Sequence, residues 1–261
     1  MKIAVSGKGG VGKSTIAAAL ALNIAKMGGK VIALDADPDA NLASALGISH
    51  EEQKKIVPIS KQVDLIEKRT DTKIDQYGKV FKLNPEVSDI ADDYGYKHKG
   101  ISVLVLGAVK TGGGGCACPE STFIRALVTN LVLYKNEALI MDMEAGIEHL
   151  GRATSQGVDV MLVVVEPGQR SIDCATTILR MAKEINLKKV VFVGNKITSK
   201  VDEDFIRTAL PGQDFLTFIP YSQTIRNADR DGVSVLDALE QDEELMVKFN
   251  EITSRIEGME R

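Results

Sequence analysis

The fold of this chain is decided by a glycine-rich stretch near its N-terminus, Gly7-Lys8-Gly9-Gly10-Val11-Gly12-Lys13-Ser14. The stretch follows the apolar run Lys2–Ser6 and precedes a segment with helical spacing, which places it in the turn between a strand and a helix. It matches the pattern G-x-x-x-x-G-K-[ST], in which backbone N–H groups converge on phosphate oxygens at a helix N-terminus. Lys13 is expected to reach the β- and γ-phosphates of a nucleotide, and the Ser14 hydroxyl to bind Mg²⁺. Thr15 is expected to cap the helix or contact the α-phosphate.

Apolar runs recur downstream of this loop and predict a parallel sheet. Seven runs rich in Val, Ile and Leu are interpreted as buried strands: Lys2–Ser6, Lys30–Asp35, Ile101–Leu106, Ala138–Asp142, Val158–Glu166, Lys189–Asn195 and Phe215–Ile219. Most are separated by helical patterns. One such pattern places Ile16, Leu20, Ile24 and Met27 on the sheet, and another does so for Phe123, Leu127 and Leu131. The alternation predicts an α/β fold, a doubly wound and mainly parallel sheet of seven to eight strands with helices on both faces.

Length and composition are consistent with a single α/β domain spanning residues 1–261. The formal net charge of −4 gives no general attraction to nucleic acid, so we expect no nucleic-acid partner. No run reaches the roughly 18 apolar residues of a membrane span, and the chain opens on a strand rather than on a signal peptide. Three cysteines form a poor disulfide framework, which favours a reducing, cytoplasmic location.

Two segments depart from the strand–helix rhythm. Residues 50–100 are rich in Lys, Asp and Glu and are expected to form a charged helical insertion. This insertion is either a solvated surface or a surface that faces a partner. Residues 107–122 form a second departure, a loop that carries two of the cysteines.

Lys8 gives the phosphate loop a second lysine. The resulting K-G-G-V-G-K-S resembles the deviant Walker A motif of the MinD/ParA/nitrogenase-iron-protein group of P-loop NTPases. In that group the early lysine crosses a dimer interface and contacts the nucleotide of the other subunit. The resemblance therefore implies an ATPase whose homodimer closes on ATP, with Lys8 and Lys13 both catalytic. The alternative for Lys8 is a solvated lysine at the mouth of the loop.

Acidic residues follow two of the predicted strands. The segment Asp35–Asn41 reads D-A-D-P-D-A-N, and the same resemblance implies that Asp37 orients or deprotonates the attacking water. The alternative for Asp37 is a helix N-cap. Asp37 is also expected to contact Mg²⁺, directly or through water, and Asp35 and Asp39 either contact Mg²⁺ through water or cap. Asp142 ends its strand as the acid of a Walker B strand does and is expected to hold Mg²⁺ through water.

The segment Asn195–Thr198 bears on the choice of base. GTP-specific relatives read N-K-x-D, because a carboxylate accepts both guanine N1–H and N2–H. Thr198 lacks that carboxylate, so the sequence favours adenine and therefore ATP. Asn195 retains a donor and an acceptor for the adenine edge, and Pro220 and Tyr221 are expected to wall the base.

Cys116 and Cys118 are separated by one residue, which is too close for an unstrained disulfide. One such pair supplies two soft ligands, whereas a closed thiolate site usually needs four. A two-fold symmetric dimer would supply the other pair. The alternative is two ordinary small residues in a loop. Cys174, within a helical segment, is interpreted as core packing.

Five segments in order carry a narrower resemblance: K-G-G-V-G-K-S, D-A-D-P-D, G-G-x-C-x-C, D-M-x-A-G-I-E-H-L and N-K. Together they are similar to the CooC/AcsF-type nickel-maturation ATPases of carbon monoxide dehydrogenase and acetyl-CoA synthase. The resemblance implies that Cys116 and Cys118 of two subunits bind Ni²⁺ or Zn²⁺, and that ATP hydrolysis is coupled to nickel delivery to one of these client enzymes. Glu144 departs from the pattern, because a small residue is expected there.

Two other classes of function remain open at this point. A MinD/ParA-like positioning ATPase would need a basic surface or an amphipathic membrane anchor. The C-terminal stripe of Leu245, Phe249, Ile252 and Ile256 is more typical of a docked helix, so we expect no stable membrane anchor. An iron–sulfur carrier or electron-donor ATPase would use another cysteine arrangement.

Overall fold

The computed structural model describes residues 1–73, 80–108, 119–135, 137–144, 157–240 and 242–259. At its centre lies an eight-stranded sheet in the order β3-β4-β2-β5-β1-β6-β7-β8. The strands are β1 Lys2–Gly7, β2 Val31–Asp35, β3 Tyr96–His98, β4 Ile101–Val105, β5 Ala138–Asp142, β6 Val160–Val165, β7 Val190–Ile197 and β8 Phe215–Pro220. All neighbours pair in parallel except β3 and β4. The predicted fold class is confirmed.

The strands lie where the sequence predicts them. They could be recognised because they are buried on both faces of the sheet. Every residue of β1, β2, β4 and β6 is buried, which explains the uninterrupted apolar runs. The antiparallel edge strand β3 was not predicted. It is three residues long and only partly buried, so it leaves no alternating pattern to find.

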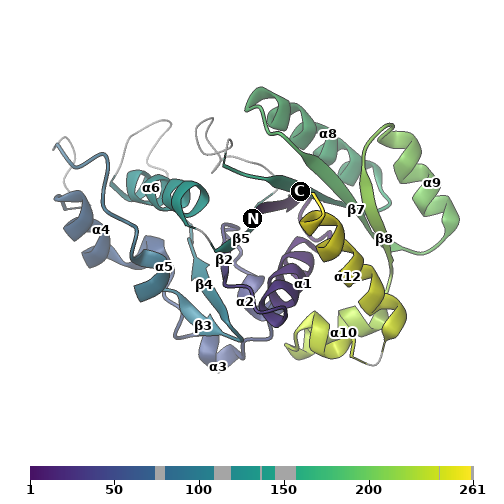
Figure 1. The fold of residues 1–261 in the computed structure, drawn as a ribbon, viewed down its shortest axis with the longest axis horizontal. Coiled ribbons are helices and arrows are strands. Elements are labelled where there is room, and N and C mark those ends of the chain that lie inside the picture. The colour runs from purple at the N-terminus through teal and green to yellow at the C-terminus, as the bar shows by residue number, and fades with distance from the viewer. Residues whose placement is uncertain (74–79, 109–118, 136, 145–156, 241, 260–261) are drawn as a thin grey trace.

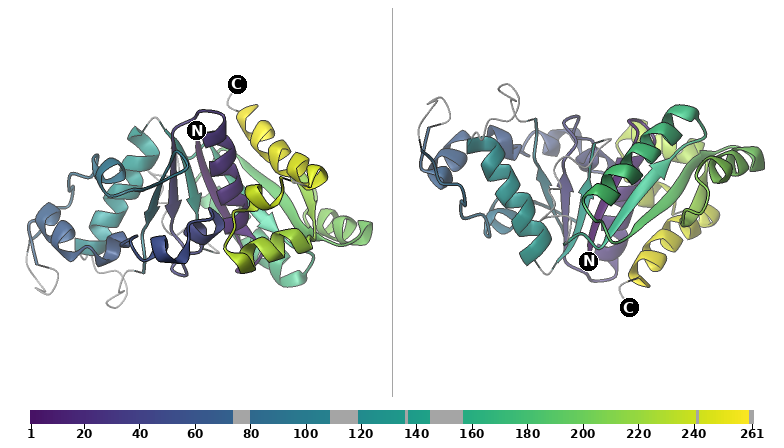
Figure 2. Two further views of the ribbon diagram at one scale, coloured as in Figure 1. Left: turned by 90° about the horizontal axis from the view of Figure 1, so that it is seen from below. Right: turned by 90° about the horizontal axis from the view of Figure 1, so that it is seen from above.

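Helices cover both faces of the sheet (Figures 1 and 2). Their bounds are α1 Lys13–Lys26, α2 Leu42–Ala45, α3 His50–Gln53, α4 Val63–Thr70, α5 Ile90–Asp93, α6 Pro119–Tyr134, α8 Gln169–Glu184, α9 Lys200–Ala209, α10 Gln223–Asp231, α11 Val235–Ala238 and α12 Glu243–Glu257, with a 3-10 turn at Ile59–Lys61. One apolar core joins α1, α2, α11 and α12 to the sheet, and a second joins α4, α5, α6, α8 and α9 to the other face.

The predicted helix faces are largely correct. Ile16, Leu20 and Ile24 are buried under α1, and Phe123, Leu127 and Leu131 are fully buried under α6. The expectation for Met27 is wrong, since its side chain is 66% exposed. The helix ends at Lys26 and the chain turns at Gly28, which has φ +89°, so Met27 leaves the helical repeat.

The C-terminal helix α12 is docked on the rest of the protein. Its stripe of Leu245, Phe249, Ile252 and Ile256 is buried against α1 and β8. Arg255 adds hydrogen bonds from its guanidinium to the carbonyl oxygens of Phe215, at 3.0 Å, and Leu216, at 2.6 Å. Within the described ranges, no helix combines the length and apolarity that crossing a membrane requires.

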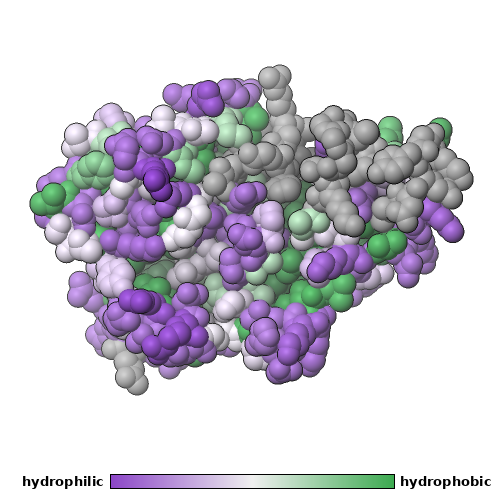
Figure 3. Space-filling model, turned by 180° about the vertical axis from the view of Figure 1, so that it is seen from behind, coloured by the Kyte–Doolittle hydropathy of each residue, from purple (hydrophilic) through white to green (hydrophobic). Residues whose placement is uncertain are grey.

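The charged segment 50–100 is not simply a helical insertion. Its described residues form the helices α3, α4 and α5, the 3-10 turn and strand β3, which extends the sheet. Ile59, Ile66 and Ile90 from this segment are buried in the second core. Its described charged residues are exposed or only partly buried, whereas Thr70 is buried. The face of the molecule in Figure 3 is largely hydrophilic outside the grey atoms.

Candidate nucleotide-binding site

A cleft of about 560 Å³ opens at the carboxyl ends of the central strands. From the phosphate loop it is lined by Gly9, Gly10, Gly12, Lys13, Ser14 and Thr15, and from later segments by Asp37, Asn195, Pro220 and Tyr221, all predicted from the sequence. Lys196, Ser222 and Arg226 also line it and were not predicted as site residues. A larger cavity of about 830 Å³ between α1, α11 and α12 contains none of the phosphate-loop residues, so the smaller cleft is the candidate site.

The loop approaches α1 through a backbone conformation that requires glycine. Gly12 has φ +100° and immediately precedes the helix that begins at Lys13. A Cβ added to Gly12 would lie 2.4 Å from Nδ2 of Asn195, which is well inside van der Waals contact. The first turn of α1 therefore points its free N–H groups into the cleft, as anion binding requires.

Asn195 braces the loop from the end of β7. Its buried side chain donates a hydrogen bond from Nδ2 to the carbonyl oxygen of Val11 at 2.7 Å. This amide nitrogen is therefore occupied by the loop. The contribution of Asn195 to the adenine edge, through its amide oxygen, stays a prediction.

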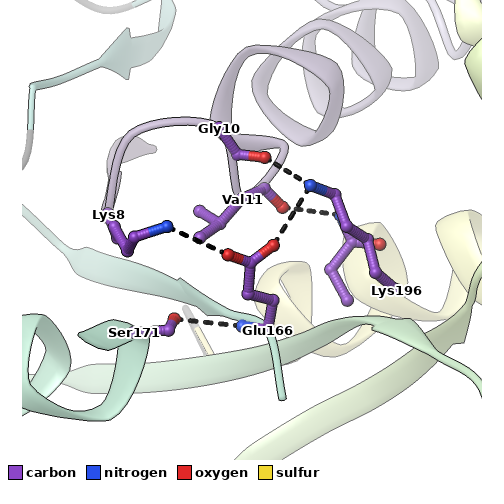
Figure 4. Close-up of polar contacts among 7 residues, drawn as sticks. Lys8, Gly10, Val11, Glu166, Ser171 and Lys196 are labelled. Carbon is purple, nitrogen blue, oxygen red and sulfur yellow. Dashed lines mark hydrogen bonds and ion pairs between the residues drawn. The ribbon is translucent and has the colours of Figure 1, made fainter. Parts of the chain in front are cut away.

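The carboxylate of Glu166, directly after β6, connects Lys8 with the end of β7 (Figure 4). Oε1 of Glu166 lies 3.1 Å from Nζ of Lys8, and Oε2 lies 3.1 Å from Nζ of Lys196. Lys196 also donates to the carbonyl oxygen of Gly10. Burial disfavours the charged form of Glu166, but the hydrogen bonds from Lys196 and Lys8 outweigh it and hold the pKa of this carboxyl below its usual value.

Two buried carboxyl groups face each other where β2 and β5 end. Asp35 and Asp142 are partners in the register of the two strands, and both are fully buried. Asp35 accepts hydrogen bonds from the backbone N–H groups of Asp37, at 3.2 Å, and Leu42, at 2.9 Å. Burial first, and then the neighbouring Asp142, raise the pKa of Asp35 to about 7. Asp35 thus accepts from the N–H group of Leu42, the first residue of α2, although it is not the N-cap residue of that helix.

Asp142 is left without such partners. Neither of its carboxylate oxygens has a hydrogen-bond partner among the described residues. Burial raises the pKa of Asp142 to about 6, although the Ser14 hydroxyl and the Lys13 ammonium group lie near enough to favour its charged form. An unpartnered carboxylate beside a hydroxyl in a phosphate cleft fits Mg²⁺, which prefers hard oxygen ligands.

Asp37 lies at the mouth of the cleft next to Lys13. Its Oδ2 is 3.7 Å from Nζ of Lys13, and its Oδ1 accepts a hydrogen bond from the backbone N–H of Asp39 at 3.0 Å. The helix N-cap is Asn41, so Asp37 is not the cap of α2. The side chain is partly exposed, which leaves it free to contact a water or a cation in the cleft.

The chain matches the family described as the CobQ/CobB/MinD/ParA nucleotide binding domain over residues 2–235. It belongs to this family. The matched region, residues 2–235, includes the phosphate loop, both acidic strand ends and Asn195, which form the cleft and its surroundings.

Relatives within the family extend along most of the chain. The carbon monoxide dehydrogenase accessory protein CooC of Rhodospirillum rubrum is 44% identical over 237 residues, 91% of this chain and 90% of that protein. An uncharacterized ATP-binding protein of Methanocaldococcus jannaschii is 44% identical over 228 residues, 86% and 87% of the two chains. The MinD cell division protein of Aquifex aeolicus superposes with a TM-score of 0.68 at 21% identity, covering 98% and 97% of the chains, which shows the shared fold.

Some residues of interest lie outside the cleft or outside the described residues. Cys116 and Cys118 lie outside the described residues. Cys174, on α8, is partly buried and packs against the second core, as predicted. Glu144 is exposed, and its carbonyl oxygen accepts a hydrogen bond from the Ser6 hydroxyl at 3.1 Å. Glu166 was missed, although an acid at the carboxyl end of a buried strand was a usable signal.

Proposed function

We propose that this protein is an ATP-hydrolysing metallochaperone that delivers nickel to carbon monoxide dehydrogenase or acetyl-CoA synthase. The observation that carries the proposal is the 44% identity to CooC across 91% of the chain, in a fold that retains the whole phosphate cleft. That relative is named as an accessory protein of carbon monoxide dehydrogenase.

The chemistry at the cleft is phosphoryl transfer from ATP to water. The buried Lys13 ammonium group, on the first residue of α1, binds the β- and γ-phosphates together with the loop N–H groups. Ser14 and Asp142 would hold Mg²⁺, directly or through water, with Asp37 at its outer side. When bound, Mg²⁺ neutralises charge on the β- and γ-phosphate oxygens.

Asp37 is the residue that positions the attacking water. Its carboxylate lies beside Lys13 at the open side of the cleft, where a water in line with the γ-phosphate would be held. Lys8 completes the catalytic set from the other subunit of an ATP-closed homodimer. Pro220 and Tyr221, at the end of β8, wall the adenine on one side of the cleft, where the Tyr221 side chain is half exposed.

The cargo is a metal ion held between two subunits. Cys116 and Cys118 of each subunit together supply four thiolates, which suit Zn²⁺ in a tetrahedron or Ni²⁺ in a plane. Metal binding releases protons as the thiols ionise, and it promotes dimerisation before ATP is added.

The test measures metal stoichiometry and molar mass together on protein purified without oxygen. The expected result is one Ni²⁺ or Zn²⁺ per dimer, lost in the Cys116→Ser, Cys118→Ser double variant while ATP affinity is kept. Cys174→Ser is the matched control and retains the metal, because Cys174 packs against the core. One metal per monomer, or full retention in the double variant, would exclude the shared site and with it the chaperone function.

A positioning ATPase of the MinD type is less well supported. Such a protein would present an amphipathic helix to a membrane, whereas the apolar residues of α12 are buried against α1 and β8.

A further inference from the structure

Lys8 already has a partner on its own chain. Its ammonium group lies 3.1 Å from Oε1 of Glu166, and Lys8 does not line the nucleotide cleft. Figure 4 shows the lysine reaching from the loop toward the end of β6, where the carboxylate stands between it and Lys196. Both side chains of the pair are partly buried, with 34% of Lys8 and 23% of Glu166 exposed.

Glu166 is held in place without the help of Lys8. Its backbone N–H donates to the hydroxyl of Ser171 at 3.1 Å, at the start of α8. Its second carboxylate oxygen pairs with Lys196, which is itself anchored to the carbonyl oxygen of Gly10. If Lys8 leaves, the carboxylate therefore keeps a cation, and no buried charge is stranded. Within this network, the contact between Lys8 and Glu166 is therefore the one that can be broken with little loss of free energy.

A partner's nucleotide is a stronger ligand for Lys8 than this carboxylate. The phosphates of ATP carry several negative charges, whereas Glu166 carries one charge that it already shares with Lys196. A partly exposed ion pair contributes little stability by itself, so phosphate oxygens brought by a second subunit can displace it.

We propose that Glu166 is a positioning residue that holds Lys8 on its own subunit, and that ATP-dependent dimerisation proceeds by exchange of this ion pair for the nucleotide of the partner. The inference rests on the proposed function, because it requires a homodimer in which Lys8 acts in trans. Glu166 thereby weakens the ATP-dependent dimerisation in proportion to the hold it keeps on Lys8, separately from the metal-dependent dimerisation proposed above.

The first measurement follows Lys8 in the nucleotide-free monomer. Acetylation by a small amine reagent, read by peptide mass spectrometry, is expected to be about threefold faster at Lys8 in Glu166→Gln than in the parent, with exposed Lys26 as internal reference. Glu203→Gln is the matched control: this carboxylate on α9 is also 23% exposed and also bridges two cations, Lys200 and Arg207. An unchanged Lys8 rate would overturn the cis contact.

The second measurement is the dimer dissociation constant by sedimentation, with a non-hydrolysable ATP analogue. Since each dimer exchanges two ion pairs, Glu166→Gln is expected to dimerise about fivefold more tightly than the parent, while Glu203→Gln is unchanged. In a Lys8→Ala background the Glu166 substitution has no further effect, because no lysine remains to release. Weaker or equal dimerisation of Glu166→Gln, or the same gain without Lys8, would overturn the exchange.

A failure of the proposed homodimer can be told apart from a failure of the proposed ion-pair exchange. If the parent stays monomeric with the analogue while Lys8 reactivity rises in Glu166→Gln, the dimer of the proposed function is wrong and the exchange falls with it, although the cis contact stands. Glu166→Asp guards against a folding defect: it keeps the charge but is too short to reach both lysines, so it should give an intermediate Lys8 rate with normal thermal unfolding.

Discussion

The two sides of the nucleotide cleft differ in how their polar groups are satisfied. On the loop side, the carbonyl oxygens of Gly10 and Val11 accept hydrogen bonds from Lys196 and Asn195. On the acidic side, Asp142 is fully buried and neither of its oxygens has a partner in the described parts of the chain. The loop side is therefore preorganised by the protein itself, whereas the acidic side leaves a buried carboxylate that a bound cation would satisfy. Substitutions on the two sides should consequently fail in different ways.

Lys13→Ala should give the largest effect, because Lys13 belongs to both sides. Lys13 is the first residue of α1, and its buried ammonium group lies 3.7 Å from Oδ2 of Asp37. Without it, the phosphates lose their main charge partner, and ATP affinity should fall about 100-fold or more, measured by calorimetry. Lys26→Ala, at the exposed last turn of the same helix, is the control and should bind as the parent does. Equal affinities in the two variants would refute the phosphate-loop assignment.

Asp37→Asn separates binding from chemistry on the acidic side. The variant should keep ATP affinity within about threefold but lose about 100-fold in single-turnover hydrolysis, because the amide cannot accept a proton from the attacking water. Asp204→Asn, on α9, exposed and outside the cleft, is the control. Normal hydrolysis by the Asp37 variant would show that the water is positioned by another group.

Gly12→Ala tests the preorganisation of the loop side. Both Gly10 and Gly12 have positive φ, so alanine at either position should cost about 1 kcal/mol of backbone strain. Only at Gly12 does the new Cβ meet Nδ2 of Asn195, whereas nothing lies within 4 Å at Gly10. Gly12→Ala should thus destabilise the nucleotide-free protein by about 1 kcal/mol more than Gly10→Ala in urea unfolding, since the bond to Val11 is lost as well.

The Asn195→Ala background checks the cause of that difference. With the amide removed, the two glycine variants should become equally unstable. A gap that persists in this background would mean that the strain at Gly12 comes from the backbone alone.

The same comparison explains what the sequence could predict. Lys13 and Ser14 belong to one contiguous motif, and the strands are uninterrupted apolar runs because both faces are buried, so local patterns located them. Contacts that depend on the order of the strands in the sheet could not be predicted from local sequence patterns. Lys8 and Glu166 are 158 positions apart, and they meet only because β1 pairs with β6. The facing of Asp35 and Asp142 likewise depends on the register of β2 and β5.

The smallest effect is expected for Asp142→Asn in the absence of Mg²⁺ and nucleotide. Burial raises the pKa of Asp142 to about 6 from its usual 3.8, so the folded state binds this proton more tightly than the unfolded state does. The stability gained from the proton is complete below about pH 4 and is lost as the pH rises through about 6. Asparagine has no such titration. The variant should therefore be more stable than the parent at pH 8, and this advantage should shrink on going to pH 5.

The advantage should be modest, about 1 kcal/mol at pH 8, because the buried amide of asparagine adds donors that also need partners. Urea unfolding in EDTA at the two pH values measures it directly. Adding Mg²⁺ and ADP should reverse the order, since the parent gains stability by binding the cation and the variant has one carboxylate fewer for it. A variant that is less stable at pH 8 in EDTA would mean that Asp142 stabilises the fold without a cation. The acidic side of the cleft would then be as complete as the loop side.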